Sequence, residues 1–177
     1  PAVENLAPPE DEADGMLLMR RSYQNNALFP VGNFDKNKWR QYRWAYFRMI
    51  EKVDAHLATI LAALRESGRF DKTLVVFTAD HGDAQGAHGW NQKTIFYDNV
   101  ARVPLMIAGP GAAPGSLSDR LVNTGADLLP TLCEFAGITV PTPMSGRSIR
   151  ASVLDPKTAD PRKYVVSETN MAQGGPI

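Results

Sequence analysis

Apolar residues recur at steps of three and four along one stretch of this chain, and they form its strongest periodic pattern. The pattern predicts an amphipathic helix from about Asn37 to Ser67, with Gly68 ending it. We expect its apolar stripe to face a core rather than to line a cofactor groove, because such regular spacing is typical of a packed face. The stripe consists of Trp39, Tyr42, Tyr46, Met49, Ile50, Val53, Leu57, Ile60, Leu61 and Leu64.

Short apolar runs after this helix predict strands. Thr73–Ala79 is uninterrupted and rich in β-branched residues, as a buried strand would be. Val103–Ala108 is a second run, and Pro104 stands near its start, where a missing N–H is tolerated. A final strand is expected at Lys163–Ser167.

Two further helices are predicted between and after these strands. Thr94–Val100 could form a short one. Asp127–Ala136 forms a longer one that ends at Gly137, with Pro130 in its first turn, where proline is accepted. Strands and helices therefore alternate without internal repeats, which predicts an α/β architecture.

The beginning of the chain shows no comparable pattern. Residues 1–15 are rich in Pro, Glu and Asp, and Pro30 and Gly32 would break a helix later in the stretch. We therefore expect residues 1–34 to be an extended or poorly ordered lead-in.

Length and composition limit the possible classes of protein. With 177 residues, of which 44% are hydrophobic, the chain is one domain or a large part of one. Lys plus Arg and Asp plus Glu number 19 each. The resulting net charge of zero argues against nucleic acid or an anionic membrane as the main partner. No apolar stretch approaches the length of a membrane span.

Cys133 is the single cysteine, so no internal disulfide can form. This fits the bacterial cytoplasm and the periplasm equally, and the compartment and oligomeric state stay open. Cys133 lies on an apolar helix with no basic residue beside it, so we expect a buried structural thiol rather than a nucleophile. No Gly-x-Ser-x-Gly elbow is present to anchor a serine-hydrolase triad.

The candidate chemistry follows the first predicted strand, where Asp80 and His81 stand next to each other. Neighbours in a regular strand point to opposite faces, so both can reach one ion only if the strand ends there, and Gly82 permits that bend. A carboxylate and an imidazole suit Mn²⁺, Zn²⁺ or Ca²⁺, although the imidazole argues mildly against Ca²⁺. Two adjacent ligands are too few for a tight site, so further ligands must come from elsewhere.

Two basic residues follow this pair. His88 lies between glycines and could be a metal ligand, a proton donor, an anion contact or a surface loop residue. Lys93 could bind an anionic substrate and neutralise charge in the transition state, or it could be a solvated loop lysine.

Several segments stand in an order that resembles a known family. They are Phe70–Thr78, Asp80–Gly82, Gly86–Gly89, Lys93, Tyr97–Asp98, Arg102–Leu105, Asp127–Leu132, Ala136–Ile138 and Gly146–Ile149. Together they resemble the C-terminal half of a sulfatase of the alkaline-phosphatase superfamily. Each segment alone is weakly specific, whereas the ordered set is much more so. The resemblance covers about residues 35 to 168.

The resemblance implies a fold and a set of roles. The fold would be an alkaline-phosphatase-like sheet flanked by helices, and residues 35–177 would be the C-terminal part of the catalytic domain. Asp80 and His81 would be metal ligands, usually of Ca²⁺, with Asn often replacing this His. Lys93 would contact the sulfate and His88 would lie near the site entrance, so both are candidate catalytic and substrate-binding residues.

The resemblance also implies what this chain lacks. Sulfatases hydrolyse sulfate esters with a formylglycine made from a Cys-x-Pro/Ala-x-Arg motif, and they carry an Asp-Asp metal pair near the N-terminus. Neither is present here, since Cys133 begins no such motif. We therefore expect a fragment that needs a missing N-terminal segment. Close relatives that use Mn²⁺ cleave phosphonate monoesters or phosphodiesters, so such an activity, or a non-catalytic metal-binding remnant, stays an alternative.

Overall fold

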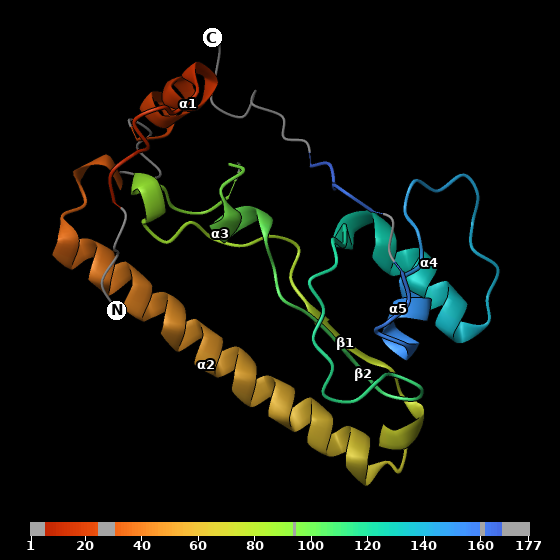
Figure 1. Cartoon of the computed structure of the whole chain (residues 1–177). Coiled ribbons are helices and arrows are strands. Elements are labelled where there is room, and N and C mark those ends of the chain that lie inside the picture. The colour runs from red at the N-terminus through yellow and green to blue at the C-terminus, as the bar shows by residue number, and fades with distance from the viewer. Residues whose placement is uncertain (1–5, 25–30, 94, 160–161, 168–177) are drawn as a thin grey trace. The chain divides into compact units, whose positions relative to one another are not determined.

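The computed structural model describes residues 6–24, 31–93, 95–159 and 162–167 (Figure 1). These residues form two compact units. The first comprises the described residues up to Ala62 together with His81–Val103. The second comprises Ala63–Asp80 and the described residues of Pro104–Ser167.

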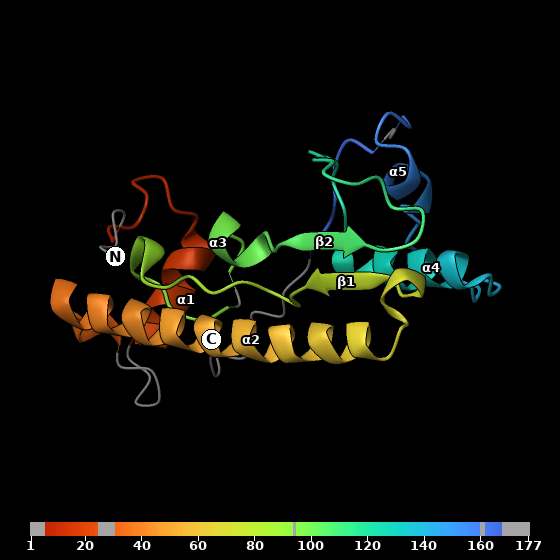
Figure 2. The same ribbon diagram turned by 90° about the horizontal axis from the view of Figure 1, so that it is seen from below.

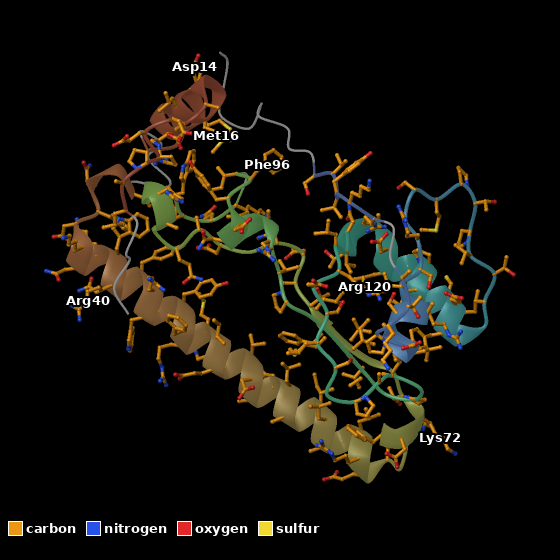
Figure 3. All side chains as sticks on the ribbon, viewed as in Figure 1. Asp14, Met16, Arg40, Lys72, Phe96 and Arg120 are labelled. Atoms are coloured by element: carbon orange, nitrogen blue, oxygen red, sulfur yellow. The ribbon has the colours of Figure 1, made fainter. Side chains whose placement is uncertain are left out.

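The first unit contains a helix that the sequence pattern did not predict. This helix, α1, spans Asp14–Gln24, inside the stretch expected to be an extended lead-in. Met16 and Met19 on α1 pack against the buried cluster of the unit, and Figure 3 shows the position of Met16. That cluster consists of Ala84, Trp90, Ile95 and Val100. A tertiary contact therefore supports α1, which local propensity alone does not indicate. A short 3-10 turn, η1, follows at Val31–Asn33.

The long predicted helix is confirmed as α2, Lys36–Glu66, which Figure 2 shows as one continuous element. The Asp35 carboxylate caps its start by accepting a hydrogen bond from the Lys38 N–H at 2.8 Å. Gly68 follows the helix end at a φ of 67°, in the left-handed region that glycine occupies without steric cost.

The apolar stripe of α2 is buried only in part, which corrects the expectation of a fully core-facing stripe. Trp39 is the one buried residue of this helix, and its ring packs edge-on against Phe34 and Tyr42. The half-buried residues of the stripe are Tyr42, Tyr46, Leu57, Leu61 and Leu64. Met49, Ile50, Val53 and Ile60 are exposed. The periodicity predicted the helix correctly, because periodicity depends on the chain alone, whereas burial depends on what packs against it.

The second unit contains a two-stranded antiparallel sheet. Strand β1 spans Val75–Thr78 and strand β2 spans Leu105–Ala108, so both predicted strands are confirmed at slightly shorter lengths. Val75 pairs with Ala108, and Thr78 pairs with Leu105. The expectation that β1 is buried is wrong within this structure, because all its residues are half-buried. A 3-10 turn, η2, precedes β1 at Phe70–Lys72.

Three short or medium helices complete the described elements. α3 spans Asp98–Ala101, at the end of the predicted helix, whose first residue Thr94 lies outside the described residues. α4 spans Thr124–Ala136, and α5 spans Arg150–Leu154. Pro130 lies in the interior of α4 rather than in its first turn, because the helix begins before Asp127.

Two further predictions concern α4 and the residues after α5. Gly137 caps α4 at a φ of 67°, and Cys133 is buried, as expected. The strand predicted at Lys163–Ser167 is wrong, because these described residues are irregular. The side chain of Asn123 donates a hydrogen bond to the Val166 carbonyl at 3.1 Å, a side-chain contact in place of a strand ladder.

The described helices and the small sheet form a partial α/β fold, which confirms the predicted class. None of the helices in the described part of the chain combines the length and apolar character that crossing a membrane requires.

Candidate functional site

The turn after β1 begins at Asp80 and contains a glycine that no other residue could replace without a clash. The Gly82 N–H donates a hydrogen bond to the Val100 carbonyl at 2.8 Å. A Cβ at Gly82 would lie 2.0 Å from the carbonyl oxygen of Asn99, far inside van der Waals contact. β1 ends at Thr78, one residue before the predicted end, and the backbone that follows it closely approaches Asn99 at Gly82.

His81 is half-buried at the start of this turn and is held by its own neighbour. Its Nδ1 lies 2.8 Å from the Gly82 carbonyl oxygen. Because a carbonyl oxygen only accepts hydrogen bonds, Nδ1 carries a hydrogen, and in the neutral ring Nε2 is then the nitrogen with a lone pair. This is the tautomer in which a metal-binding histidine is usually fixed by a backbone carbonyl.

Asp80 and His81 together fit part of the coordination shell of a divalent ion. Asp80 is exposed and offers carboxylate oxygens, the preferred ligands of hard cations. Within the described ranges, no three His, Cys, Asp or Glu side chains gather closely enough to hold an ion. The donor chemistry of the pair therefore suits a metal, and a complete site would need further ligands beyond these two side chains.

His88 lies in a tightly closed loop. The Ala84 N–H bonds to the Gln92 carbonyl at 2.9 Å, and the Gly86 N–H bonds to the Trp90 carbonyl at 2.7 Å. A 3-10 turn, η3, spans Ala87–Gly89, and His88 within it has φ 53° and ψ 25°. This left-handed conformation is uncommon for a residue with a side chain and requires support from its surroundings.

A buried ion pair lies against this loop. Two nitrogens of Arg20 bond to the Glu12 carboxylate, at 2.5 Å and 2.9 Å, and the guanidinium also donates to the His88 carbonyl. Arg20 lies over the Trp90 ring at 4.9 Å from the ring centroid. The Tyr97 hydroxyl donates to Glu12 at 2.6 Å, and the Tyr97 ring stacks on the His88 ring at 4.3 Å between centroids.

The charges of this cluster shift two pKa values. The hydrogen bonds from Arg20 hold the pKa of the Glu12 carboxyl below its usual range, against the opposing effect of burial, and the Tyr97 hydroxyl lowers it further. Burial and the bond to the Glu12 carboxylate raise the pKa of Tyr97 to about 12. Glu12 is therefore an anion and Tyr97 a neutral donor at neutral pH.

The predicted basic residues occupy different environments. His88 is half-buried in its turn, whereas Lys93 is exposed on the segment that leaves the same loop. His81, His88 and Lys93 all belong to the first unit, and Asp80 is the last residue of its segment in the second. The sequence analysis missed Glu12 and Arg20. The local signal was that Met19 and Arg20 lie three and four residues after Met16, on one face of a possible helix.

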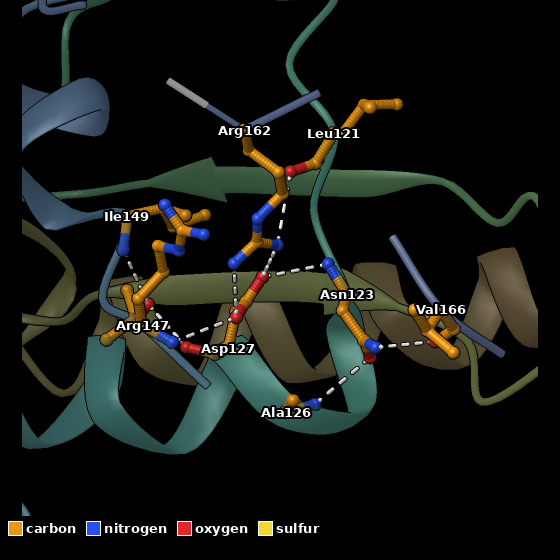
Figure 4. A network of polar contacts seen from close by, with 9 residues as sticks. Leu121, Asn123, Ala126, Asp127, Arg147, Ile149, Arg162 and Val166 are labelled. Carbon is orange, nitrogen blue, oxygen red and sulfur yellow. Dashed lines mark hydrogen bonds and ion pairs between the residues drawn. The ribbon is translucent and has the colours of Figure 1, made fainter. Parts of the chain in front are cut away.

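A second buried ion pair, in the second unit, was also missed (Figure 4). The Asp127 side chain is fully buried and accepts hydrogen bonds from the backbone N–H groups of Asn123 and Arg147 at 2.8 Å and 3.0 Å. Arg162 donates to both of its carboxylate oxygens.

The Asp127 carboxylate is ionised and fully engaged. Burial alone would raise its pKa, but the bonds from Arg162 and from the two backbone N–H groups outweigh burial and lower it. Both oxygens are already used, so this carboxylate joins three segments of the unit rather than serving a substrate.

Comparison with known proteins identifies the family to which this partial α/β fold belongs. The family model described as Sulfatase matches residues 10–138. The chain belongs to the sulfatase family. This confirms the resemblance, and it extends the match toward the N-terminus far enough to include Glu12 and Arg20.

Individual relatives agree with this family. An arylsulfatase of Clostridium perfringens is 31% identical over 146 residues, covering 80% of this chain and 30% of the relative. A choline-sulfatase of Rhizobium meliloti is 41% identical over 145 residues, covering 77% and 27%. The structure of a phosphonate monoester hydrolase from Silicibacter pomeroyi is similar with a TM-score of 0.77 and 27% identity, covering 93% of this chain and 34% of that one. The chain thus spans about a third or less of the relatives it matches.

Proposed function

We propose that this chain is the C-terminal part of the catalytic domain of a metal-dependent sulfuric ester hydrolase. The observation that carries the proposal is the family match, which includes the whole segment from Asp80 to Lys93. The chain contains no Cys-x-Pro/Ala-x-Arg motif, so the nucleophile and the remaining metal ligands must come from an N-terminal segment. The isolated chain is expected to be inactive.

In this proposal Asp80 and His81 are two of the metal ligands. Asp80 would bind through its carboxylate and His81 through Nε2, because Nδ1 is occupied by the Gly82 carbonyl. The metal, when bound, supplies positive charge that stabilises oxyanions of the ester in the transition state. Ca²⁺ is the usual ion of the family, and the imidazole ligand keeps Mn²⁺ and Zn²⁺ as alternatives.

Lys93 and His88 are the proposed catalytic and substrate-binding residues. The exposed ammonium group of Lys93 would bind the anionic sulfate and neutralise the charge that develops on its oxygens. His88 would contact the ester near the entrance, where an imidazole can accept or donate a proton near neutral pH. The expected substrate is a small-molecule sulfate ester.

A phosphonate monoester or phosphodiester is the second candidate substrate. The similarity to a phosphonate monoester hydrolase supports it, and so does His81, since an imidazole suits a transition metal better than Ca²⁺. Sulfate and phosphonate monoesters present similar tetrahedral anions, so the same lysine and histidine could serve either.

The test is hydrolysis of a nitrophenyl sulfate and a nitrophenyl phosphonate by the complete protein, by its Asp80→Ala variant and by the isolated chain. We expect activity in the complete protein, its loss in Asp80→Ala, and none in the isolated chain. Asp71→Ala is the matched control, because Asp71 is an exposed carboxylate in the turn before β1. The faster ester identifies the substrate class. An inactive complete protein with an intact fold would instead favour a non-catalytic metal-binding remnant.

A further inference from the structure

We infer that Arg20, held by Glu12, is a positioning residue that sets the backbone and ring of His88 for the reaction. The inference rests on the proposed function, because His88 is one of the proposed catalytic residues. Its basis is the set of contacts that converge on His88 from α1 and from the segment around Tyr97.

The guanidinium of Arg20 donates a hydrogen bond directly to the carbonyl of His88. A guanidinium carries its donors in a rigid planar fork, so the bonds to Glu12 fix the direction of the bond to His88. The Trp90 ring covers the face of the same guanidinium. The cation is therefore held on its edges and on one face, and its donor to His88 has little freedom to move.

The backbone of His88 needs this support because its conformation is unfavourable. Its φ of 53° lies in a region that residues with a Cβ rarely adopt, and such a conformation persists only where surrounding contacts enforce it. The bond from Arg20 anchors the peptide immediately after this dihedral. Without that anchor, the turn can relax toward the commoner helical or extended regions, and the His88 side chain would then point elsewhere.

The ring of His88 is supported separately, because it stacks on the ring of Tyr97. The Tyr97 hydroxyl is bonded to the same Glu12 carboxylate that holds Arg20. Glu12 therefore supports both the backbone of His88, through Arg20, and its ring, through Tyr97. One buried carboxylate thus supports both the backbone and the ring of His88, whose Nδ1 also lies 3.4 Å from the Ala7 carbonyl oxygen.

Stability alone is a poor explanation for this pair. The side chains of Arg20 and Glu12 are 9% and 2% exposed, and desolvating two such charges offsets much of their attraction. Buried ion pairs are often no more stabilising than apolar residues of the same volume, while they do enforce one geometry. The loop around His88 needs such a fixed geometry, because His88 adopts a left-handed conformation there.

The chain offers a matched control in its second unit. Arg162 and Asp127 form an ion pair with side chains 9% and 0% exposed, so its burial resembles that of the first pair. Asp127 of this pair bonds to the backbone N–H groups of Asn123, just before α4, and of Arg147. Neither is a proposed site residue. Breaking either pair is expected to lower stability, whereas only the first should act through His88.

The experiment is a double-mutant cycle in the complete protein. Steady-state hydrolysis of nitrophenyl sulfate is compared for wild type, Arg20→Met, His88→Ala and the double variant, and then for Arg162→Met with and without His88→Ala. We expect Arg20→Met to lower kcat on the order of tenfold or more, as a misplaced catalytic group does. In the double variant the two losses should not multiply, because Arg20 acts through His88. Losses that multiply, or equal coupling of Arg162 to His88, would overturn the inference.

A milder variant and a second measurement distinguish loss of His88 positioning from misfolding and from failure of the proposed function. Tyr97→Phe removes one hydroxyl and should reproduce part of the kcat loss with little effect on KM. Amide hydrogen exchange at Gly89 and Trp90 should accelerate in Arg20→Met and not in Arg162→Met. If the wild type cleaves neither ester, the proposed function fails, and unchanged exchange at this turn would separately reject Arg20 as its support.

Discussion

The carbonyl oxygen of Asn99 occupies the space that a side chain on Gly82 would need, since a Cβ there would lie 2.0 Å away. The next carbonyl, that of Val100, accepts the hydrogen bond of the Gly82 N–H. The turn that carries His81 is therefore packed backbone to backbone against the start of α3, and it cannot accept a larger residue without shifting.

Gly82→Ala should disturb this turn and lower both stability and activity. Backbone atoms cannot give way cheaply, so a loss of about 1–3 kcal/mol in the free energy of unfolding is expected, as for other overpacked sites. Urea unfolding and ester hydrolysis of the complete protein measure the two effects. Gly125→Ala is the control, because its Cβ would make an ordinary contact at 3.5 Å with Asn123 Oδ1. Equal effects of the two substitutions would refute the packing argument.

Asp127→Asn should destabilise the second unit. The substitution keeps the shape of the side chain but removes the negative charge that compensates buried Arg162. Breaking a buried pair from one side costs roughly 3–5 kcal/mol, because a charge is left without compensation. Chemical unfolding measures the loss. Replacing both residues, Asp127→Asn with Arg162→Met, should recover part of it, and a double variant less stable than either single one would contradict the explanation.

The Asp127 carboxyl should also make stability depend on pH in the acid range. Its pKa is lower in the folded protein than in the unfolded chain, so its contribution is present above the unfolded pKa and is lost as the pH falls through the folded pKa. The free energy of unfolding should therefore fall below about pH 4, near the unfolded pKa of Asp. Asp127→Asn should show a shallower decline than wild type.

Tyr97 should ionise late. Its pKa is raised to about 12. An absorbance titration of wild type should therefore show a phenolate transition near that pH, and Tyr97→Phe should lack this transition. Because the folded pKa is raised, the stabilising contribution is complete below about pH 10, the unfolded value, and is lost as the pH rises through the folded pKa. An ordinary titration of Tyr97 in the folded protein would contradict both its burial and its bond to Glu12.

His81→Asn should change the metal preference of the protein. An amide offers an oxygen ligand in place of a nitrogen, so binding of Mn²⁺ and Zn²⁺ should weaken relative to Ca²⁺. Competition binding with the three ions in the complete protein measures the shift. His56→Asn, on the exposed face of α2, is the control. If both variants bind the three ions as wild type does, His81 is not a metal ligand.

Elements with strong local patterns were predictable from the amino-acid order. The periodic apolar stripe located α2, the β-branched run located β1, and Gly68 and Gly137 located two helix ends. Each of these signals depends on backbone preferences and side-chain spacing within a few residues, which the chain carries wherever it folds. The resemblance to the family came from a different signal, the ordered set of short motifs that includes Asp80–Gly82 and Gly86–Gly89.

Elements that depend on distant partners were not predictable. α1 has no strong pattern of its own and is supported by packing of Met16 and Met19 against residues much later in the chain. Lys163–Ser167 has strand-like composition, yet these residues form no ladder, and Val166 bonds to the side chain of Asn123 instead. Composition indicates what a segment can form, and available partners decide what it does form.

By itself, therefore, the sequence determined the positions of α2, β1, β2 and α4, the turn at Asp80 and His81, and membership of a family through short ordered motifs. The tertiary structure alone decided that Arg20, paired with Glu12, meets His88, and that Asp127 meets Arg162. The reason is physical: motifs are local, while a buried charge is stable only opposite a partner, and chain folding brings that partner from far away in sequence.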